Sequence, residues 1–193
     1  MGKMGTSVRD GEIPRRRGEK ERMAMKESTV ALEPLRQAMR LEQEGHRFYL
    51  EAAERMADPR GAEMFRSLAR DEELHLRTIR RQYEALSEGK GWIAAAEKSE
   101  KPIDLDKPLL PPERETLERT IKAEAGAAEV LHFALEFENN VYNLYRKAAA
   151  ETTDPTGRAM YEWLSGQELE HFNLLMLNYE YLARSGHWLG LQR

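Results

Sequence analysis

The sequence contains one unit written twice, and this duplication limits the folds that the chain can adopt. Residues 39–86 align without a gap on residues 135–182, at a constant separation of 96 residues. The alignment pairs identical residues: Glu42 with Glu138, Tyr49 with Tyr145, Asp58-Pro59 with Asp154-Pro155, Gly61 with Gly157, Leu68 with Leu164, Glu72 with Glu168, His75 with His171, and Tyr83-Glu84 with Tyr179-Glu180. Self-similarity at a fixed separation indicates a duplicated supersecondary unit.

Each copy reads as two amphipathic helices joined by a tight turn. Apolar residues recur every three or four positions, as on one face of a helix, and Asp-Pro turns interrupt this period. We therefore expect helical hairpins over about 32–87 and 126–184. One hairpin cannot bury its own apolar face, so two copies packed together predict an all-α, antiparallel four-helix bundle.

The segments outside the hairpins lack a helical period. Residues 1–30 combine charges of both signs with several glycines, and we expect a disordered tail there. Residues 88–125 are punctuated by Gly and Pro, which predicts a long crossover with one short helix over about 113–122. The bundle domain would then span residues 31–193.

Composition excludes several classes of protein. The 193 residues include no cysteine, which excludes disulfides, thiolate metal sites and thiol catalysis. No apolar run approaches the roughly 18 residues that a membrane span requires, and the N-terminal residues lack a secretory signal. The formal net charge of −4 disfavours a nucleic-acid partner. We therefore expect a cytoplasmic protein with neither a nucleic-acid nor a membrane partner.

Six ionisable residues fall on the core-facing positions of the predicted helices. They are one glutamate from each odd-numbered helix and a Glu-x-x-His pair from each even-numbered helix: Glu42, Glu72, His75, Glu138, Glu168 and His171. Residues three apart on a helix share one face, so both members of each pair can reach one point. Four uncompensated carboxylates in a core would carry heavy desolvation and repulsion penalties.

Two divalent cations would balance these four carboxylates. No Lys or Arg lies on the same seams. Carboxylate and imidazole ligands without thiolate suit iron or manganese. A Glu from each of two helices with Glu-x-x-His from the other two is the ligand pattern of di-iron and di-manganese bundles. The sequence therefore predicts a buried site for two Fe ions, with Mn or a mixed Fe/Mn pair as the alternative.

The motifs around these residues resemble the ferritin-like superfamily, and within it the rubrerythrin-type domain. The likeness covers about residues 32–185. It is carried by LEQEGHRFY (41–49) and FENNVYNLY (137–145), with a tyrosine seven residues after the glutamate, and by DEELH (71–75) and QELEH (167–171).

The resemblance implies a role for each residue of the site. The six ionisable residues would bind the metals and carry the catalysis. Glu42, Glu72 and His75 would hold mainly one metal, and Glu138, Glu168 and His171 would hold the other. Glu72 and Glu168 would bridge the two.

Other interpretations of individual residues stay open. Glu-x-x-His also occurs on solvated faces, although the duplication argues against that placement. The resemblance makes Tyr49 and Tyr145 hydrogen-bond donors to ligand carboxylates, but either can equally be an ordinary core aromatic. His46 pairs with Tyr142 in the repeat and is expected on a helix flank. His132 and His187 lie outside the pattern and are expected at the surface.

The resemblance implies an oxidoreductase that reduces peroxide or dioxygen, with two departures. Peroxide-reducing rubrerythrins have an additional Glu three residues after the third-helix ligand, where this chain has Val141; the matching residue of the first repeat is Gly45. The cysteine-rich rubredoxin module is missing, so electrons would come from an external donor such as a rubredoxin or a flavoprotein. A homodimer is expected. The alternatives are a non-catalytic, ferroxidase-type iron-handling protein, a di-iron oxygenase, or a metal-free interaction bundle.

Overall fold

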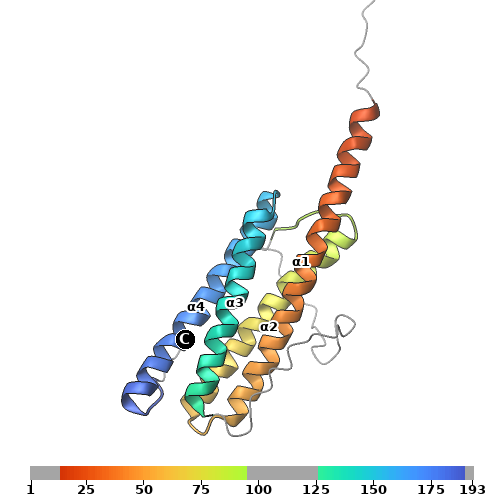
Figure 1. Ribbon diagram of the computed structural model, residues 1–193. Coiled ribbons are helices and arrows are strands. Elements are labelled where there is room, and N and C mark those ends of the chain that lie inside the picture. Colours follow the sequence, from red (N-terminus) through yellow and green to blue (C-terminus); the bar gives the residue numbers. More distant parts are fainter. Residues whose placement is uncertain (1–13, 95–125, 190–193) are drawn as a thin grey trace, which may run out of the picture.

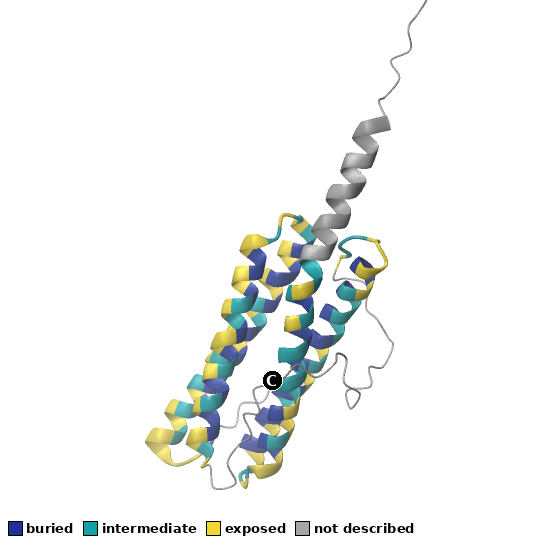
Figure 2. Ribbon diagram, turned by 45° about the vertical axis from the view of Figure 1, so that its right-hand side comes forward, coloured by how far each residue is buried: buried dark blue, intermediate teal, exposed yellow. Residues whose placement is uncertain are grey.

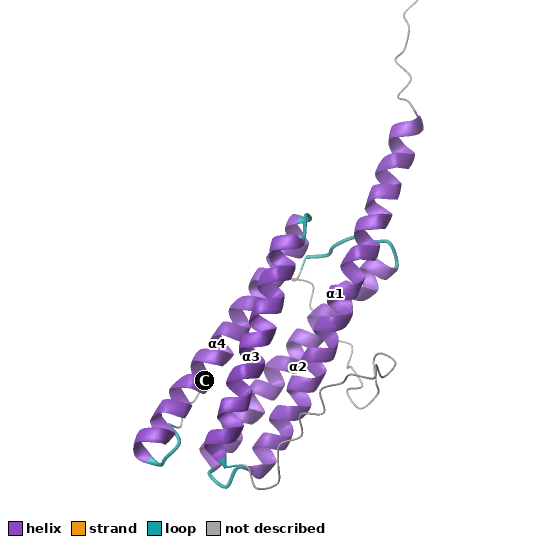
Figure 3. Ribbon diagram, in the orientation of Figure 1, coloured by secondary structure: helices purple, strands orange, loops and turns teal. Residues whose placement is uncertain are grey.

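The computed structural model describes residues 14–94 and 126–189, and the side chains from residue 31 onward. The described part contains four helices and no strand (Figures 1 and 3). Their bounds are α1 (Pro14–Arg55), α2 (Pro59–Ser87), α3 (Ala127–Glu151) and α4 (Pro155–Ser185). The predicted all-α bundle of two helical hairpins is confirmed. Both hairpin ranges agree with the helices to within a few residues, except at the start of α1.

The two turns within the hairpins have the same construction. Asp58 caps α2 by accepting a hydrogen bond from the backbone N–H of Arg60, and Asp154 caps α4 by accepting from Thr156 and Gly157. A proline follows each aspartate at the first helical turn, where its missing N–H costs nothing. The duplicated Asp-Pro pair therefore fixes the start of both even-numbered helices.

The hairpins pack into one bundle. α1 packs against α2, α3 packs against α4, and α1 also contacts α3. Buried residues recur along all four helices between exposed ones (Figure 2). They form two apolar clusters. One includes Tyr49, Phe65 and Leu131 near the α1–α2 turn, and the other includes Leu35 and Tyr161 near the α3–α4 turn.

A tryptophan from each hairpin packs against the other hairpin. Trp188, which follows α4, packs edge-to-face against Phe65 of α2, with ring centres 5.9 Å apart. Trp92, after α2, packs in the same way on Tyr161 of α4 at 5.8 Å. The two tryptophans are themselves 96 residues apart, so the duplication extends beyond the helices. These aromatic contacts join the two hairpins at the ends of the bundle.

The N-terminal segment differs from its sequence-based expectation. The prediction of a disordered tail over residues 1–30 does not hold from Pro14 onward, because α1 begins there. Residues 19–26 are Glu, Lys, Arg, Met and Ala, whose high helix propensity extends a helix without an apolar period. Residues 1–13, the predicted helix at 113–122 and most of the crossover lie outside the described residues. Across the described ranges, no helix has an apolar stretch long enough to cross a bilayer.

Alanine substitutions at the two glycines that face the tryptophans test how much these contacts stabilise the packing of the hairpins. A Cβ at Gly61 would lie 2.5 Å from the Trp188 indole, and one at Gly157 would lie 2.6 Å from Trp92. We predict that Gly61→Ala or Gly157→Ala lowers the free energy of unfolding by about 1–3 kcal/mol through overpacking. Gly166→Ala is the matched control, because nothing lies within 4 Å of that position.

Thermal and denaturant unfolding followed by circular dichroism measures this effect. The Gly166→Ala control should be neutral or up to about 1 kcal/mol more stable, because alanine favours a helix over glycine. Equal stability of Gly61→Ala and the Gly166→Ala control would show that the tryptophan contact contributes little.

Candidate metal centre

The six ionisable residues predicted from the sequence meet at one point inside the bundle. α1 and α3 supply Glu42 and Glu138, and α2 and α4 supply the two Glu-x-x-His pairs. Each of the six is at most 1% exposed. The residues lie between the two apolar clusters in each helix, so apolar packing shields the site along the bundle axis.

The cluster divides into two overlapping groups of potential ligands. Glu42, Glu72, His75 and Glu168 form one group, and Glu72, Glu138, Glu168 and His171 form the other. Within each group, one donor atom from every residue lies within 4.8 Å of the others. Glu72 and Glu168 belong to both groups. Two ions held by these groups would therefore have both of these carboxylates in common.

Both histidines turn the same ring nitrogen toward the carboxylates. Nδ1 of His75 lies 3.1 Å from Oε1 of Glu168 and 3.3 Å from Oε2 of Glu42. Nδ1 of His171 lies 3.2 Å from Oε1 of Glu72 and 3.3 Å from Oε2 of Glu168. The two imidazole rings stack with their centres 5.4 Å apart. The site therefore has an approximate twofold arrangement inherited from the duplication.

Several potential ligand atoms of the cluster lack a hydrogen-bond partner, and a metal pair fits this pattern. Within the described residues, the buried atoms without a partner include Oε2 of Glu42, Oε1 of Glu72, Oε2 of Glu138, both carboxylate oxygens of Glu168, and Nδ1 of both histidines. In the described part of the chain, the four glutamates form ion pairs with the two histidines and not with Lys or Arg. Buried polar atoms without partners are costly, and cations would satisfy all of them at once.

Two buried tyrosines hydrogen-bond to the cluster across the hairpins. The hydroxyl of Tyr49 in α1 donates to Oε1 of Glu138 in α3. The hydroxyl of Tyr145 in α3 donates to Oε1 of Glu42 in α1. Both tyrosines are fully buried. They are thus donors to the predicted ligand carboxylates, and each one orients the glutamate of the opposite hairpin.

Comparison with known proteins decides the family. The family model described as Rubrerythrin matches residues 33–179, which is most of the chain. The chain belongs to the Rubrerythrin family. The matched range contains all six clustered residues and both tyrosines. No curated protein matches the sequence.

The positions where the sequence departs from peroxide-reducing rubrerythrins carry no carboxylate. Val141 is buried in the apolar cluster that also contains Tyr145. Gly45 is buried, and a Cβ there would lie 2.9 Å from the Phe137 ring and 3.4 Å from the carboxyl carbon of Glu72. Neither position therefore supplies a further glutamate ligand, and a side chain at Gly45 would crowd the Phe137 ring.

The other histidines stay outside the cluster. His132 is exposed and lies 3.9 Å from Glu136. His187 is exposed and His46 is half-buried, and neither belongs to a group of potential ligands in the described residues.

Sequence reasoning missed two residues that contact the site histidines. Oδ2 of Asp71 lies 3.6 Å from Nε2 of His171. The ring of Trp163 packs edge-on against His75, with centres 5.5 Å apart. Each breaks the internal repeat, since Gln167 and Ser67 stand at the matching positions. Comparing the halves for their differences would have pointed to both residues.

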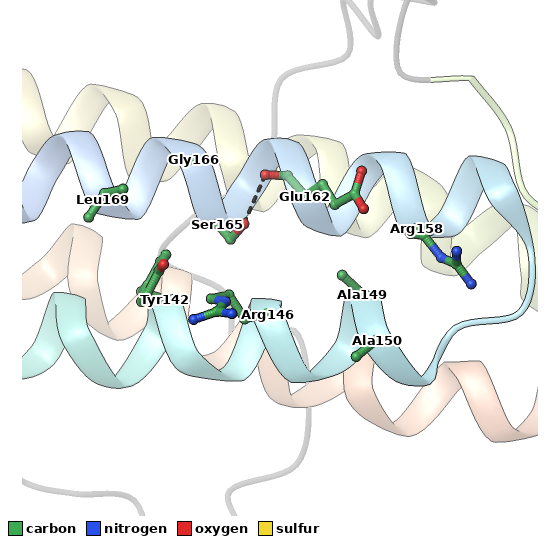
Figure 4. Close-up of a pocket in the computed structure, with 9 residues that line it drawn as sticks. All are labelled: Tyr142, Arg146, Ala149, Ala150, Arg158, Glu162, Ser165, Gly166 and Leu169. Atoms are coloured by element: carbon green, nitrogen blue, oxygen red, sulfur yellow. Dashed lines mark hydrogen bonds between the residues drawn. The ribbon is translucent and has the colours of Figure 1, made fainter.

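A groove on the outside of α3 and α4 is separate from the cluster. Figure 4 shows its lining residues on the two helices. The groove has a volume of about 500 Å³. Its lining includes Tyr142, Arg146, Arg158 and Glu162. None of the six clustered residues lines it.

Burial and mutual repulsion favour the protonated forms of several groups in the cluster. Desolvation, together with neighbouring glutamates, raises the pKa of Glu138 to about 8 and that of Glu72 well above its usual value. Desolvation opposes charge on His75 and His171, but the surrounding carboxylates outweigh it. They raise the pKa of His75 to about 9 and that of His171 well above the ordinary range. Desolvation also opposes charge on Glu168, but its close contacts with the two histidines outweigh desolvation and lower its pKa.

We predict that metal binding releases these protons. A metal ligand must be deprotonated, and Glu138 and His75 hold protons up to about pH 8 and 9. The apparent affinity for a divalent cation should therefore rise as pH increases from 6 to 9. Calorimetric titration at pH 7 in two buffers of different ionisation enthalpy measures the protons released. Binding with no proton release at pH 7 would contradict these protonation states.

Proposed function

We propose that the protein is a di-iron oxidoreductase that reduces peroxide or dioxygen with electrons from an external donor. The observation that carries the proposal is the pair of ligand groups that share Glu72 and Glu168 inside the bundle. Membership of the Rubrerythrin family supports the same conclusion.

The ligand chemistry favours iron. Four carboxylates and two imidazoles offer oxygen and nitrogen donors without thiolate, a set that suits iron and, as the alternative, manganese. Four carboxylates and two divalent cations also cancel in charge. When bound, the two irons would supply two electrons to the oxidant.

The remaining work falls to the protein. Glu72 and Glu168 would hold the two metals at a fixed separation, and each histidine would complete one end. Tyr49 and Tyr145 would keep Glu138 and Glu42 in their binding orientation through their hydroxyls. Such hydrogen bonds to ligands tune affinity and reactivity. Burial of the whole cluster limits water at the metals and strengthens the electrostatic interactions inside the site.

An external electron donor is part of the proposal. The 193 residues contain no cysteine, and an iron–sulfur relay is held by cysteine thiolates. A rubredoxin or a flavoprotein would supply the electrons, and the cytoplasm is the compartment that we propose for this exchange.

The second candidate is an iron-handling protein of ferroxidase type. Val141 and Gly45 favour it, because the additional carboxylate of peroxide-reducing rubrerythrins has no counterpart at either position. The same six residues would then bind and oxidise iron without catalytic turnover of peroxide.

Rapid mixing tests the proposal. Protein loaded anaerobically with two Fe²⁺ per chain is mixed with H₂O₂ or O₂, and near-ultraviolet absorbance follows iron oxidation. We expect a fast absorbance rise that is lost in Glu72→Gln, because that variant lacks a shared carboxylate. Glu136→Gln, on the exposed side of α3, is the control and should behave as the unaltered protein. No fast change with either oxidant would contradict the proposal.

Turnover separates the two candidates. With NADH, a reductase and a rubredoxin supplied, the oxidoreductase should consume many equivalents of peroxide per chain. A single round of iron oxidation without continued peroxide consumption would favour iron handling instead.

A further inference from the structure

The two halves of the site are alike in their six ligands and differ behind the histidines. Asp71 of the first half corresponds to Gln167 of the second half. Trp163 of the second half corresponds to Ser67 of the first half. Asp71 and Trp163 both contact a site histidine. The internal symmetry therefore ends at the outer edges of the two imidazoles.

His171 has a carboxylate behind it. Its Nδ1 faces the glutamates, and its Nε2 lies at an ion-pair distance of 3.6 Å from Oδ2 of Asp71. Asp71 is about one third exposed, at the rim of the site. A carboxylate at the outer nitrogen keeps the N–H there, leaves the inner nitrogen free to bind metal, and makes that nitrogen more basic.

His75 has an aromatic ring behind it instead. Its Nε2 has no hydrogen-bond partner among the described residues. Its ring instead makes an edge-on contact with Trp163, at an interplanar angle of 87°, and an indole offers His75 no carboxylate. The imidazole of His75 is therefore the less basic ligand of the two and is less firmly fixed in one tautomer.

We propose that the two metal positions are unequal, and that Asp71 makes the position at His171 the tighter one. The position at His75 would then exchange its ion more readily. Asp71 is a positioning residue, since it acts on the metal through His171. The inference rests on the ligand set of the proposed function, but it requires no redox activity.

A binding experiment with single-histidine variants isolates each position. His75→Ala keeps the position at His171, and His171→Ala keeps the position at His75. Co²⁺ is the probe, followed by its visible absorption and by calorimetry at fixed pH. We expect His75→Ala to bind one Co²⁺ at least about 10-fold more tightly than His171→Ala does, which is the usual scale of such outer-sphere effects.

Asp71→Asn in both backgrounds assigns the cause. It should weaken Co²⁺ binding by about 10-fold or more when His171 is the remaining histidine, and by less than about twofold when His75 is. Glu73→Gln is the control, because it removes a negative charge from the same helix, from a side chain that pairs with Arg77. It should change neither affinity by more than about twofold. In the otherwise unaltered chain, Asp71→Asn should still bind two ions, the first one more weakly.

The outcomes separate this inference from the proposed function. An equal loss of affinity in both backgrounds would indicate a general effect of charge and would overturn the inference, as would no loss at all. If the unaltered protein binds two Co²⁺ in either of these cases, the proposed function stands and only this inference fails. If the unaltered protein binds no Co²⁺ pair, the ligand assignment fails and both proposals fall. Helical circular dichroism confirms that each variant is folded.

Discussion

The burial of four carboxylates in the centre of a helical bundle is the constraint on which the rest of the structure depends. Each of these groups would lose several kcal/mol of hydration if it were ionised without compensation, and they repel one another. Burial and repulsion raise the pKa of Glu138 to about 8, and the surrounding carboxylates raise that of His75 to about 9. Two cations would replace the protons on these groups and satisfy the unpaired donor atoms.

The duplication arranges this cluster so that neither hairpin completes it alone. Each group of potential ligands takes at least one residue from the opposite hairpin, and each buried tyrosine donates across the same boundary. The two tryptophans also pack across it, at the ends of the bundle. The site is therefore complete only when the two hairpins are packed together, and metal binding is expected to stabilise the native state by mass action.

The sequence predicts the cluster well because its residues obey a period. Glu72 and His75 share a helix face with buried apolar residues, and the repeat shows the pattern twice, which made all six positions recognisable. The start of α1 was not predictable in this way, because helix propensity extends it without an apolar face. The partners of Tyr49 and Tyr145 depend on how the hairpins pack, which a periodic pattern does not specify. Asp71 and Trp163 were missed because they break the repeat that identifies the other site residues.

The central claim is that two divalent ions balance the four buried glutamates, and native mass spectrometry tests it most directly. Purified metal-free protein is incubated with an excess of Fe²⁺ without oxygen and transferred to a volatile buffer. The mass of the intact metal–protein complex is then measured. The account predicts a dominant species with two metal ions per chain, and a loss of that pair in a variant with both Glu72→Gln and Glu168→Gln. A chain that carries no metal, or a single ion that survives both substitutions, would contradict it.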